Sequence, residues 1–172
     1  VGFWVLKLLA SRYGQGALWK NHSSCRYLNV KIAEKEVLLL MPQKFMNLSG
    51  EAIQPLLSFY KIPLSDLTVV QDDLDIQIGD LKFKKGGSSG GHRGVEDIIQ
   101  CLGDSNFLRV KIGISHPKDT DETARIDVKS WVLQKPFAEE MSKLKEASQR
   151  AADGLELYIK DGLLAVQHKF HT

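Results

Sequence analysis

The sequence predicts an α/β fold, in which helices flank a twisted mixed β-sheet in a single three-layer domain. Three observations lead to this prediction. Segments with strand-like alternation are interleaved with segments that repeat apolar residues at helical spacing. Two neighbouring strand segments, Cys25–Ile32 and 37–41, are separated by a short turn and predict a hairpin, which adds antiparallel pairing to the sheet. No internal repeat or low-complexity linker interrupts the chain, so we expect residues 1–172 to form one domain.

The first half of the chain predicts two helices around the hairpin. Residues 3–13 place apolar side chains on one face of a helix and polar ones on the other. No capping residue precedes this helix, which indicates that the sequence begins inside an element. Pro42 ends the second hairpin strand. Residues 48–60 again have helical spacing, and we expect Pro55 to bend this helix or to shift its start.

The second half predicts three strands and further helices. The strands span 67–70, 81–85 and 108–114, and a helix over 95–102 follows a Gly-rich stretch. The last third repeats apolar residues at helical spacing from Met141 to Tyr158. Asp161 and Gly162 are expected to end this helix before a short final one.

The composition is that of an ordinary globular protein. Of the 172 residues, 43% are hydrophobic and 26% charged, with a formal net charge of +2, which excludes a disordered tail, a collagen-like fibre and a mostly membranous chain. The longest apolar run, 37–41, is far shorter than the ~20 residues of a membrane span. The net charge argues against bulk nucleic-acid binding but is compatible with a local basic face. Cys25 and Cys101 match no metal spacing or disulfide framework, so we expect a reducing compartment, the cytoplasm.

The Gly-rich stretch at 84–94 is the first candidate for a functional site. Glycines allow the backbone to approach a ligand closely, and the helix that follows offers free N–H groups and the positive end of its dipole. The dipole favours a neutral imidazole at His92, which can both donate and accept a hydrogen bond. No Walker loop or dinucleotide fingerprint is present. The alternative is a flexible connector that carries a surface histidine.

A second candidate is the acidic end of the strand at 67–70. Asp72 follows this strand closely, and ligands of α/β sheets bind outside the carboxyl ends of strands. A carboxylate there can orient a histidine and raise its basicity. Together with Asp73 and Asp75 it can also hold Mg²⁺. The alternative, a solvated turn, is the interpretation that we favour for Asp73 and Asp75.

A third candidate lies ahead of the helix at 48–60. The amide of Asn47 donates and accepts together, which suits recognition of a peptide or ester group. Ser49 is expected to cap the helix. Phe45 and Met46 are candidates either for the core or for a stacking platform.

Basic residues form the fourth candidate. The alternation places Lys82 and Lys84 on one face of the strand at 81–85, and Arg109 and Lys111 on one face of the strand at 108–114. If these strands are neighbours, a small basic patch that holds a few phosphates forms near His92. The alternative is a set of solvated lysines at a sheet edge.

Taken in order, these segments resemble bacterial-type peptidyl-tRNA hydrolases along the whole chain. Each motif is modest alone, whereas their order and spacing together are highly specific. The motifs are Phe45-Met46-Asn47-Leu48-Ser49-Gly50, Asp72-Asp73-Leu74-Asp75, Lys82-Phe83-Lys84, Gly90-Gly91-His92-Arg93-Gly94, Lys111-Ile112-Gly113-Ile114, His116-Pro117 and Trp131-Val132-Leu133. The resemblance implies a monomeric cytoplasmic esterase that needs no cofactor or metal and releases peptides from peptidyl-tRNA by cleaving the ester to the 3′-terminal ribose.

The resemblance also implies roles for individual residues. Asp72 would orient and polarise a catalytic histidine, Asn47 would contact the substrate and help to place the water, and His92 would line the pocket. Phe45, Met46 and Gly91 would contact the peptide side of the substrate. Lys84 and Lys111 would clamp the tRNA phosphate end, with Lys82 and Arg109 beside them. Arg93 stands where the family usually has Asn, and we expect it to meet a phosphate or a ribose hydroxyl.

The largest departure from the family lies at the front of the chain. The family's opening strand, its Gly-Asn-Pro-Gly turn and its Thr-Arg-His-Asn motif have no counterpart in this sequence. By spacing, the family's catalytic histidine falls two residues ahead of Val1, so we expect an N-terminally incomplete domain. Two other functions stay open: a non-catalytic RNA-binding protein on the same fold, and a Mg²⁺-dependent phosphohydrolase that uses Asp72, Asp73 and Asp75.

Overall fold

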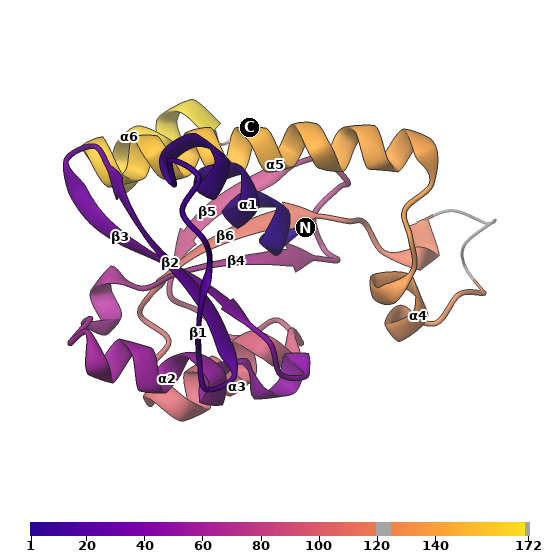
Figure 1. The fold of residues 1–172 in the computed structure, drawn as a ribbon. Helices are drawn as coiled ribbons and strands as arrows, with labels where there is room; N and C mark the ends of the chain where they lie inside the picture. The colour runs from indigo at the N-terminus through magenta and orange to yellow at the C-terminus, as the bar shows by residue number, and fades with distance from the viewer. Residues whose placement is uncertain (120–124, 171–172) are drawn as a thin grey trace.

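A computed structural model describes residues 1–119 and 125–170 and confirms the predicted α/β fold. Helices cover both sides of the strands, which gives three layers (Figure 1). The helices are α1 (Gly2–Tyr13), α2 (Ser49–Phe59), α3 (Arg93–Leu102), α4 (Val128–Leu133), α5 (Ala138–Asp161) and α6 (Leu163–Phe170). The strands are β1 (Lys20–His22), β2 (Cys25–Ile32), β3 (Lys35–Pro42), β4 (Thr68–Asp73), β5 (Leu81–Lys85) and β6 (Leu108–Gly113). Short 3₁₀ segments are η1 (Met46–Leu48), η2 (Leu64–Asp66) and η3 (Pro117–Asp119).

The described strands form two sheets, whereas the sequence predicts one mixed sheet. The predicted hairpin is confirmed, because β2 and β3 pair antiparallel with Tyr27 opposite Leu40. The hairpin, however, builds a sheet of its own with β1 rather than adding antiparallel pairing to a common sheet. The mixed pairing lies in the other sheet, where β6 runs parallel to β4 on one side and antiparallel to β5 on the other. The strand β1 was not predicted, since its three residues are polar and too few to show an alternation.

Two apolar cores hold the layers together. One lies under α1, α5 and α6 and includes the buried Phe83, Val110 and Ile112 of β5 and β6. Val5 and Leu9 of α1 also belong to this core, as the periodicity of the helix predicts. The second core lies on the side of α2 and α3. The middle strand β6 contributes Val110 and Ile112 to the first core only.

The helix ends agree largely with the prediction. The helix α2 begins at Ser49 and contains Pro55. The helix α5 ends at Asp161 and is followed by Gly162, whose φ of 88° favours glycine. The short α4 stands apart from the two sheets, beyond the end of β6 (Figure 1). Among residues 1–119 and 125–170, no helix has the length and apolar content that a membrane crossing requires.

Candidate active site

His92 caps the N-terminus of α3, as the Gly-rich motif predicts. Its Nδ1 accepts a hydrogen bond from the backbone N–H of Val95, with 3.3 Å between the two nitrogens. This contact satisfies one of the free donors of the first helical turn. Because Nδ1 acts as an acceptor, the proton of the neutral ring resides on Nε2. His92 is therefore held as a hydrogen-bond donor that points its Nε2–H away from α3.

The group that faces Nε2 is the carboxylate of Asp72, near the C-terminal end of β4. The distance from Nε2 of His92 to Oδ1 of Asp72 is 3.4 Å. Burial of this carboxylate acts to raise its pKa, but its hydrogen bond and electrostatic interaction with His92 outweigh burial, so that the pKa of Asp72 lies below its usual range. Asp72 is thus a fixed anion, and the structure brings together two of the three predicted catalytic side chains.

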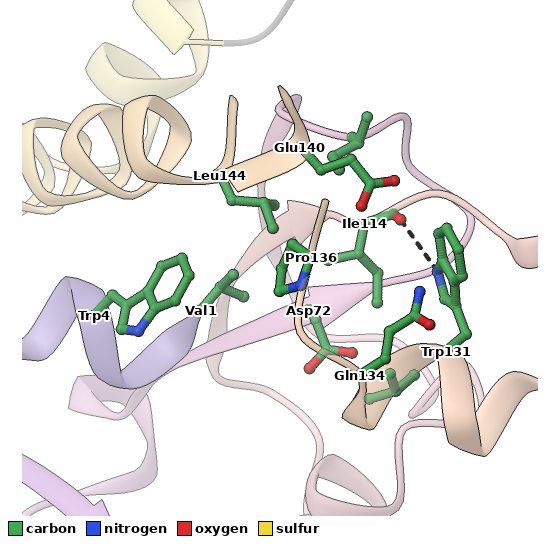
Figure 2. A pocket seen from close by; sticks show the side chains of 11 residues that line it. Val1, Trp4, Asp72, Ile114, Trp131, Gln134, Pro136, Glu140 and Leu144 are labelled. Atoms are coloured by element: carbon green, nitrogen blue, oxygen red, sulfur yellow. Dashed lines mark hydrogen bonds between the residues drawn. The ribbon is translucent and has the colours of Figure 1, made fainter. Parts of the chain in front are cut away.

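Asp72 also lines a pocket that reaches from β4 to α4. Trp131 and Gln134 form one wall, and Ile114 and Glu140 contribute to the same pocket (Figure 2). The indole N–H of Trp131 donates to the backbone oxygen of Ser115, 2.9 Å away, which ties α4 to the segment that follows β6. Asp72 thus lies where it was predicted, near the C-terminal end of a strand, and it lines this pocket. Trp131 was noted in the sequence only as part of a motif, and no signal placed it beside Asp72.

The remaining walls of the pocket come from residues far apart in the sequence. Sequence reasoning missed Gln134 and Glu140, because the segment around them showed no periodicity that fixed its place in the fold. Further lining residues are Val1, Trp4, Ile78, Val132, Pro136 and Leu144. The pocket therefore combines two carboxylates, Asp72 and Glu140, with apolar lining residues that include the indole rings of Trp4 and Trp131.

Asn47 lies on η1, which packs against α3 close to His92. The neighbouring Met46 lies so close to Gly94 that an added Cβ there would come 2.5 Å from its Sδ and 3.1 Å from Cε1 of His92. Met46 is 57% exposed and Phe45 is 81% exposed, so Phe45 is no core residue. The side chain of Asn47 is exposed on the same segment. The structure thus places this amide on the element that borders the histidine.

The helix α2 is capped from outside, contrary to the prediction for Ser49. The Oγ of Ser49 donates to the backbone oxygen of Met46 at 2.8 Å. The N–H groups of Gly50 and Glu51 donate instead to Oδ2 of Asp97 in α3, at 2.7 and 3.2 Å. A carboxylate at this end is also favoured by the helix dipole. This contact fixes the start of α2, which directly follows η1, relative to α3.

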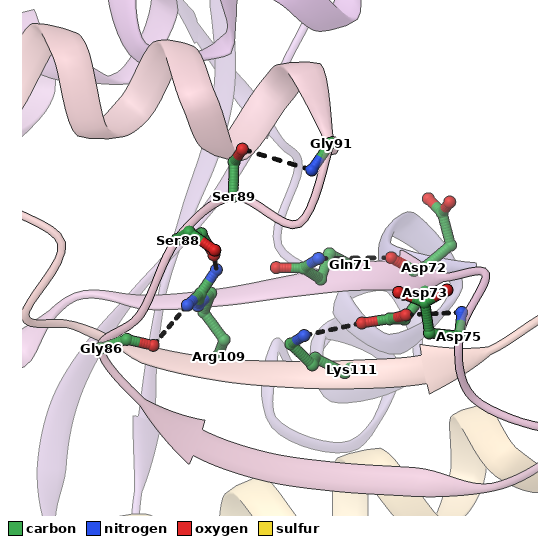
Figure 3. Close-up of polar contacts among 10 residues, drawn as sticks. All are labelled: Gln71, Asp72, Asp73, Asp75, Gly86, Ser88, Ser89, Gly91, Arg109 and Lys111. Carbon is green, nitrogen blue, oxygen red and sulfur yellow. Dashed lines mark hydrogen bonds and ion pairs between the residues drawn. The ribbon is translucent and has the colours of Figure 1, made fainter.

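The predicted basic patch is much smaller than expected. The strands β5 and β6 are neighbours, with Lys82 opposite Lys111 and Lys84 opposite Arg109. Lys82 and Lys84 are exposed, as predicted. The prediction that Arg109 lies on the surface is wrong. Arg109 is only 1% exposed, and its guanidinium donates to the backbone oxygens of Gly86 and Ser88 (Figure 3). The Gly-rich loop covers Arg109 on the face of β6 that the alternation of polar and apolar residues had placed in solvent.

Lys111 and Asp73 form a partly buried ion pair. Nζ of Lys111 lies 2.7 Å from Oδ2 of Asp73, and the two side chains are 16% and 11% exposed (Figure 3). The interpretation of Asp73 as a solvated turn residue is therefore wrong, whereas Asp75 is exposed as expected. Among the residues that the structure describes, no three His, Cys, Asp or Glu side chains converge as metal ligands. Asp72, Asp73 and Asp75 do not form such a group.

Gly91 and Arg93 flank His92 at the start of α3, and both are exposed. Gly91 has a φ of 82°, which glycine adopts without strain, and its N–H donates to Oγ of Ser89 at 3.3 Å. Both residues therefore lie beside His92, and their contacts with a substrate stay predictions. His92 itself contacts Asp72 but does not belong to the lining of the pocket at Asp72, contrary to the prediction.

Comparison with known proteins identifies the family. The family model described as peptidyl-tRNA hydrolase matches residues 1–172. A peptidyl-tRNA hydrolase from Haemophilus influenzae is 36% identical, over 99% of this chain and 86% of its own length. One from a Geobacter species is 43% identical, over 94% of this chain and 82% of its own length. The crystal structure of peptidyl-tRNA hydrolase from Acinetobacter baumannii superposes with a TM-score of 0.87 at 30% identity, covering 99% of this chain and 84% of that one. The chain belongs to the peptidyl-tRNA hydrolase family.

Proposed function

We propose that this protein hydrolyses the ester between peptide and tRNA in peptidyl-tRNA and so returns the tRNA for reuse. Family membership over the whole chain supports this reaction. The single observation that carries the proposal is the Asp72 carboxylate, held by His92 in the wall of a pocket with an aromatic side. A fixed anion at this point can orient the group that takes a proton from water.

His92 itself is poorly suited to accept that proton. Its Nδ1 lone pair faces the N–H of Val95, and its Nε2 carries the proton that faces Asp72. We therefore propose that the proton acceptor is a separate group, the catalytic histidine that the family resemblance implies, which Asp72 would orient and polarise. The attacking water would add to the carbonyl carbon, and its proton would end on the ribose oxygen as the ester C–O bond breaks. This assigns His92 a supporting part: it holds the charge of Asp72 in place.

The substrate would lie across η1 and the start of α3. The exposed amide of Asn47 can contact the ester or the water, and the exposed Phe45 and Met46 can form the wall on the peptide side. Gly91 and Arg93 border the same place. Arg93 carries a charge that suits a phosphate or a ribose hydroxyl.

The tRNA end would be bound by lysines of the second sheet. Lys82 and Lys84 are exposed and point to one face of β5, so both are free to approach phosphates. Lys111 can reach a phosphate only by sharing or leaving Asp73, which makes its contribution smaller than that of an unpaired lysine. We further propose that the protein acts as a monomer in the cytoplasm, where its two free cysteines stay reduced.

A cleavage assay on peptidyl-tRNA tests the proposed function. The substrate is an N-acetylaminoacyl-tRNA, assayed with this chain and with a form that carries a Thr-Arg-His segment ahead of Val1. We expect ester cleavage by the extended form, unchanged in excess EDTA. Binding of tRNA without cleavage by both forms would favour the RNA-binding alternative. Loss of cleavage in EDTA would favour the Mg²⁺-dependent one.

A further inference from the structure

We infer that Arg109 is a positioning residue: from the middle strand of the second sheet it fixes the Gly-rich loop so that His92 faces Asp72. This inference rests on the proposed function, in which the His92–Asp72 contact supports the reaction. The sequence pointed to Arg109 as a tRNA contact, and its burial removes that role. A buried cation with no part in substrate binding needs another explanation.

Arg109 donates hydrogen bonds to one segment, the Gly-rich loop between β5 and α3. Nη1 donates to the backbone oxygen of Ser88 at 2.5 Å, and Nη2 donates to that of Gly86 (Figure 3). Both hydrogen bonds that the structure describes for this guanidinium therefore end in the loop between β5 and α3. The planar guanidinium presents N–H donors in fixed directions, so one arginine can bind two separate carbonyl oxygens at once. A lysine ammonium on its flexible chain is less well suited to hold both.

The loop depends on such an anchor because its own backbone is permissive. Gly86, Gly87, Gly90 and Gly91 all have positive φ values, between 61° and 96°. Glycines in this region lose more conformational entropy on ordering than other residues, so an unanchored loop would populate many conformations. Arg109 holds the carbonyls on both sides of Gly87. A Cβ on Gly87 would come 2.8 Å from Nη2, which shows how closely the loop seats on the guanidinium.

A short chain of contacts leads from this anchor to the histidine. Ser88 is followed by Ser89, whose backbone oxygen accepts from the N–H of His92 at 3.1 Å. The Oγ of Ser89 accepts from the N–H of Gly91 at 3.3 Å. The turn that begins next to the Arg109 contact therefore ends at the N-cap of α3. A shift of Ser88 would be transmitted to the ring that faces Asp72.

The charge of Arg109 argues against a role in packing alone. Burial lowers the pKa of this guanidinium, and the charge of Asp73 only partly offsets the effect. Asp73 is already paired with Lys111, which leaves the carbonyls of the loop as the close partners of Arg109. An apolar side chain of similar length would fill the space without this desolvation. Filling space therefore does not explain why an arginine occupies this position, whereas its two directed hydrogen bonds do.

The test compares Arg109→Lys with the unaltered protein by two independent readouts. The first is the pair of ¹⁵N signals of the His92 ring, which distinguish a proton on Nε2 from a proton on Nδ1. We expect them to move from the Nε2–H tautomer toward a mixture. The second is peptidyl-tRNA cleavage, measured for both proteins in the form with the added Thr-Arg-His segment. We expect Arg109→Lys to lower kcat about 10-fold or more, with KM changed less than about twofold. Gly87→Ala should move the same signals, because its Cβ would displace the guanidinium.

Val110→Ala is the matched control. Val110 is fully buried on the same strand but belongs to the core under α5, on the opposite face. This variant should lower Tm without moving the His92 signals or kcat. Unchanged His92 signals in both Arg109→Lys and Gly87→Ala would overturn the inference, as would shifted signals with unchanged kcat. If the form with the added Thr-Arg-His segment cleaves no peptidyl-tRNA while its His92 signals still respond to Arg109→Lys, the proposed function fails and the positioning contact stands.

Discussion

Replacing Asp72 by Asn removes the negative charge from the site while keeping the size of the side chain. In the structure this carboxylate faces Nε2 of His92 at 3.4 Å and lines the pocket in which the reaction is proposed. Asn retains an oxygen that can accept from His92, so the fold around the pair should persist. What is lost is the anion that would polarise the proton acceptor. We therefore expect an effect on the chemical step rather than on tRNA affinity.

The geometry sets the size of this effect. A hydrogen bond to a charged group contributes about 1.5–3 kcal/mol, and about 1.4 kcal/mol corresponds to a tenfold change in rate. The Asp72 side chain is 23% exposed, so solvent weakens its interaction with the proton acceptor. This exposure favours the lower end of the range. Asp72→Asn should reduce kcat about 10-fold.

The assay is single-turnover cleavage of N-acetylaminoacyl-tRNA by the active form of the protein, which is the form with the added Thr-Arg-His segment. A filter-binding measurement gives the tRNA affinity. Asp75→Asn is the matched control, because Asp75 is an exposed carboxylate on the same segment. We expect the control to retain full turnover. Wild-type turnover in Asp72→Asn, or an equal loss in both variants, would refute the reasoning.

Three further outcomes follow from other parts of the structure. Lys82→Ala with Lys84→Ala should weaken tRNA binding and reduce the slope of log K against log salt by about 1–2, and an unchanged slope would show that these exposed lysines contact no phosphate. Burial raises the pKa of Cys25 to about 11, so in the folded protein at pH 8 a thiol reagent should modify the partly exposed Cys101 first; equal rates would contradict this. The Ser130 hydroxyl and N–H hold the pKa of the Asp127 carboxyl below its usual range, so this cap of α4 is present above that range and lost as pH falls through the lowered pKa. The protection of the α4 amides, measured as their exchange rate relative to the intrinsic rate at the same pH, should fall there, and Asp127→Ala should show low protection at every pH.

Local signals were sufficient to predict the central pair of the site. Glycines ahead of a helical segment placed His92 at a helix start, and a short apolar strand placed Asp72 at a strand end. Both predictions depend on a few consecutive residues, whose conformational preferences act without the rest of the fold. For the same reason the hairpin of β2 and β3 could be predicted from its turn.

Contacts between distant segments could not be predicted in the same way. Alternation placed Arg109 and Lys111 on one face of β6, but it contains no information about what covers that face. The Gly-rich loop buries Arg109, and Asp73 of the neighbouring strand engages Lys111. Asp97 of α3 likewise took over the capping role predicted for Ser49. In each case a partner from another element decided the outcome.

The division of the strands into two sheets has a similar origin. Strand pairing is set by long-range packing, and the sequence pattern of a strand is the same whichever sheet it joins. The wall of the pocket at Trp131 and Gln134 depends on how α4 folds back on the end of β6, through the hydrogen bond from Trp131 to Ser115. No periodicity of the segment specifies that docking.

The central claim is that water cleaves the ester of peptidyl-tRNA at the site of Asp72 and His92. Cleavage of N-acetylaminoacyl-tRNA in H₂¹⁸O, followed by mass spectrometry of both products, tests it most directly. We expect one ¹⁸O atom in the carboxylate of the released peptide, none in the tRNA, and loss of labelled product in parallel with kcat in Asp72→Asn. Label on a phosphate of the RNA, or tRNA that is bound and never cleaved by the active form, would contradict the claim.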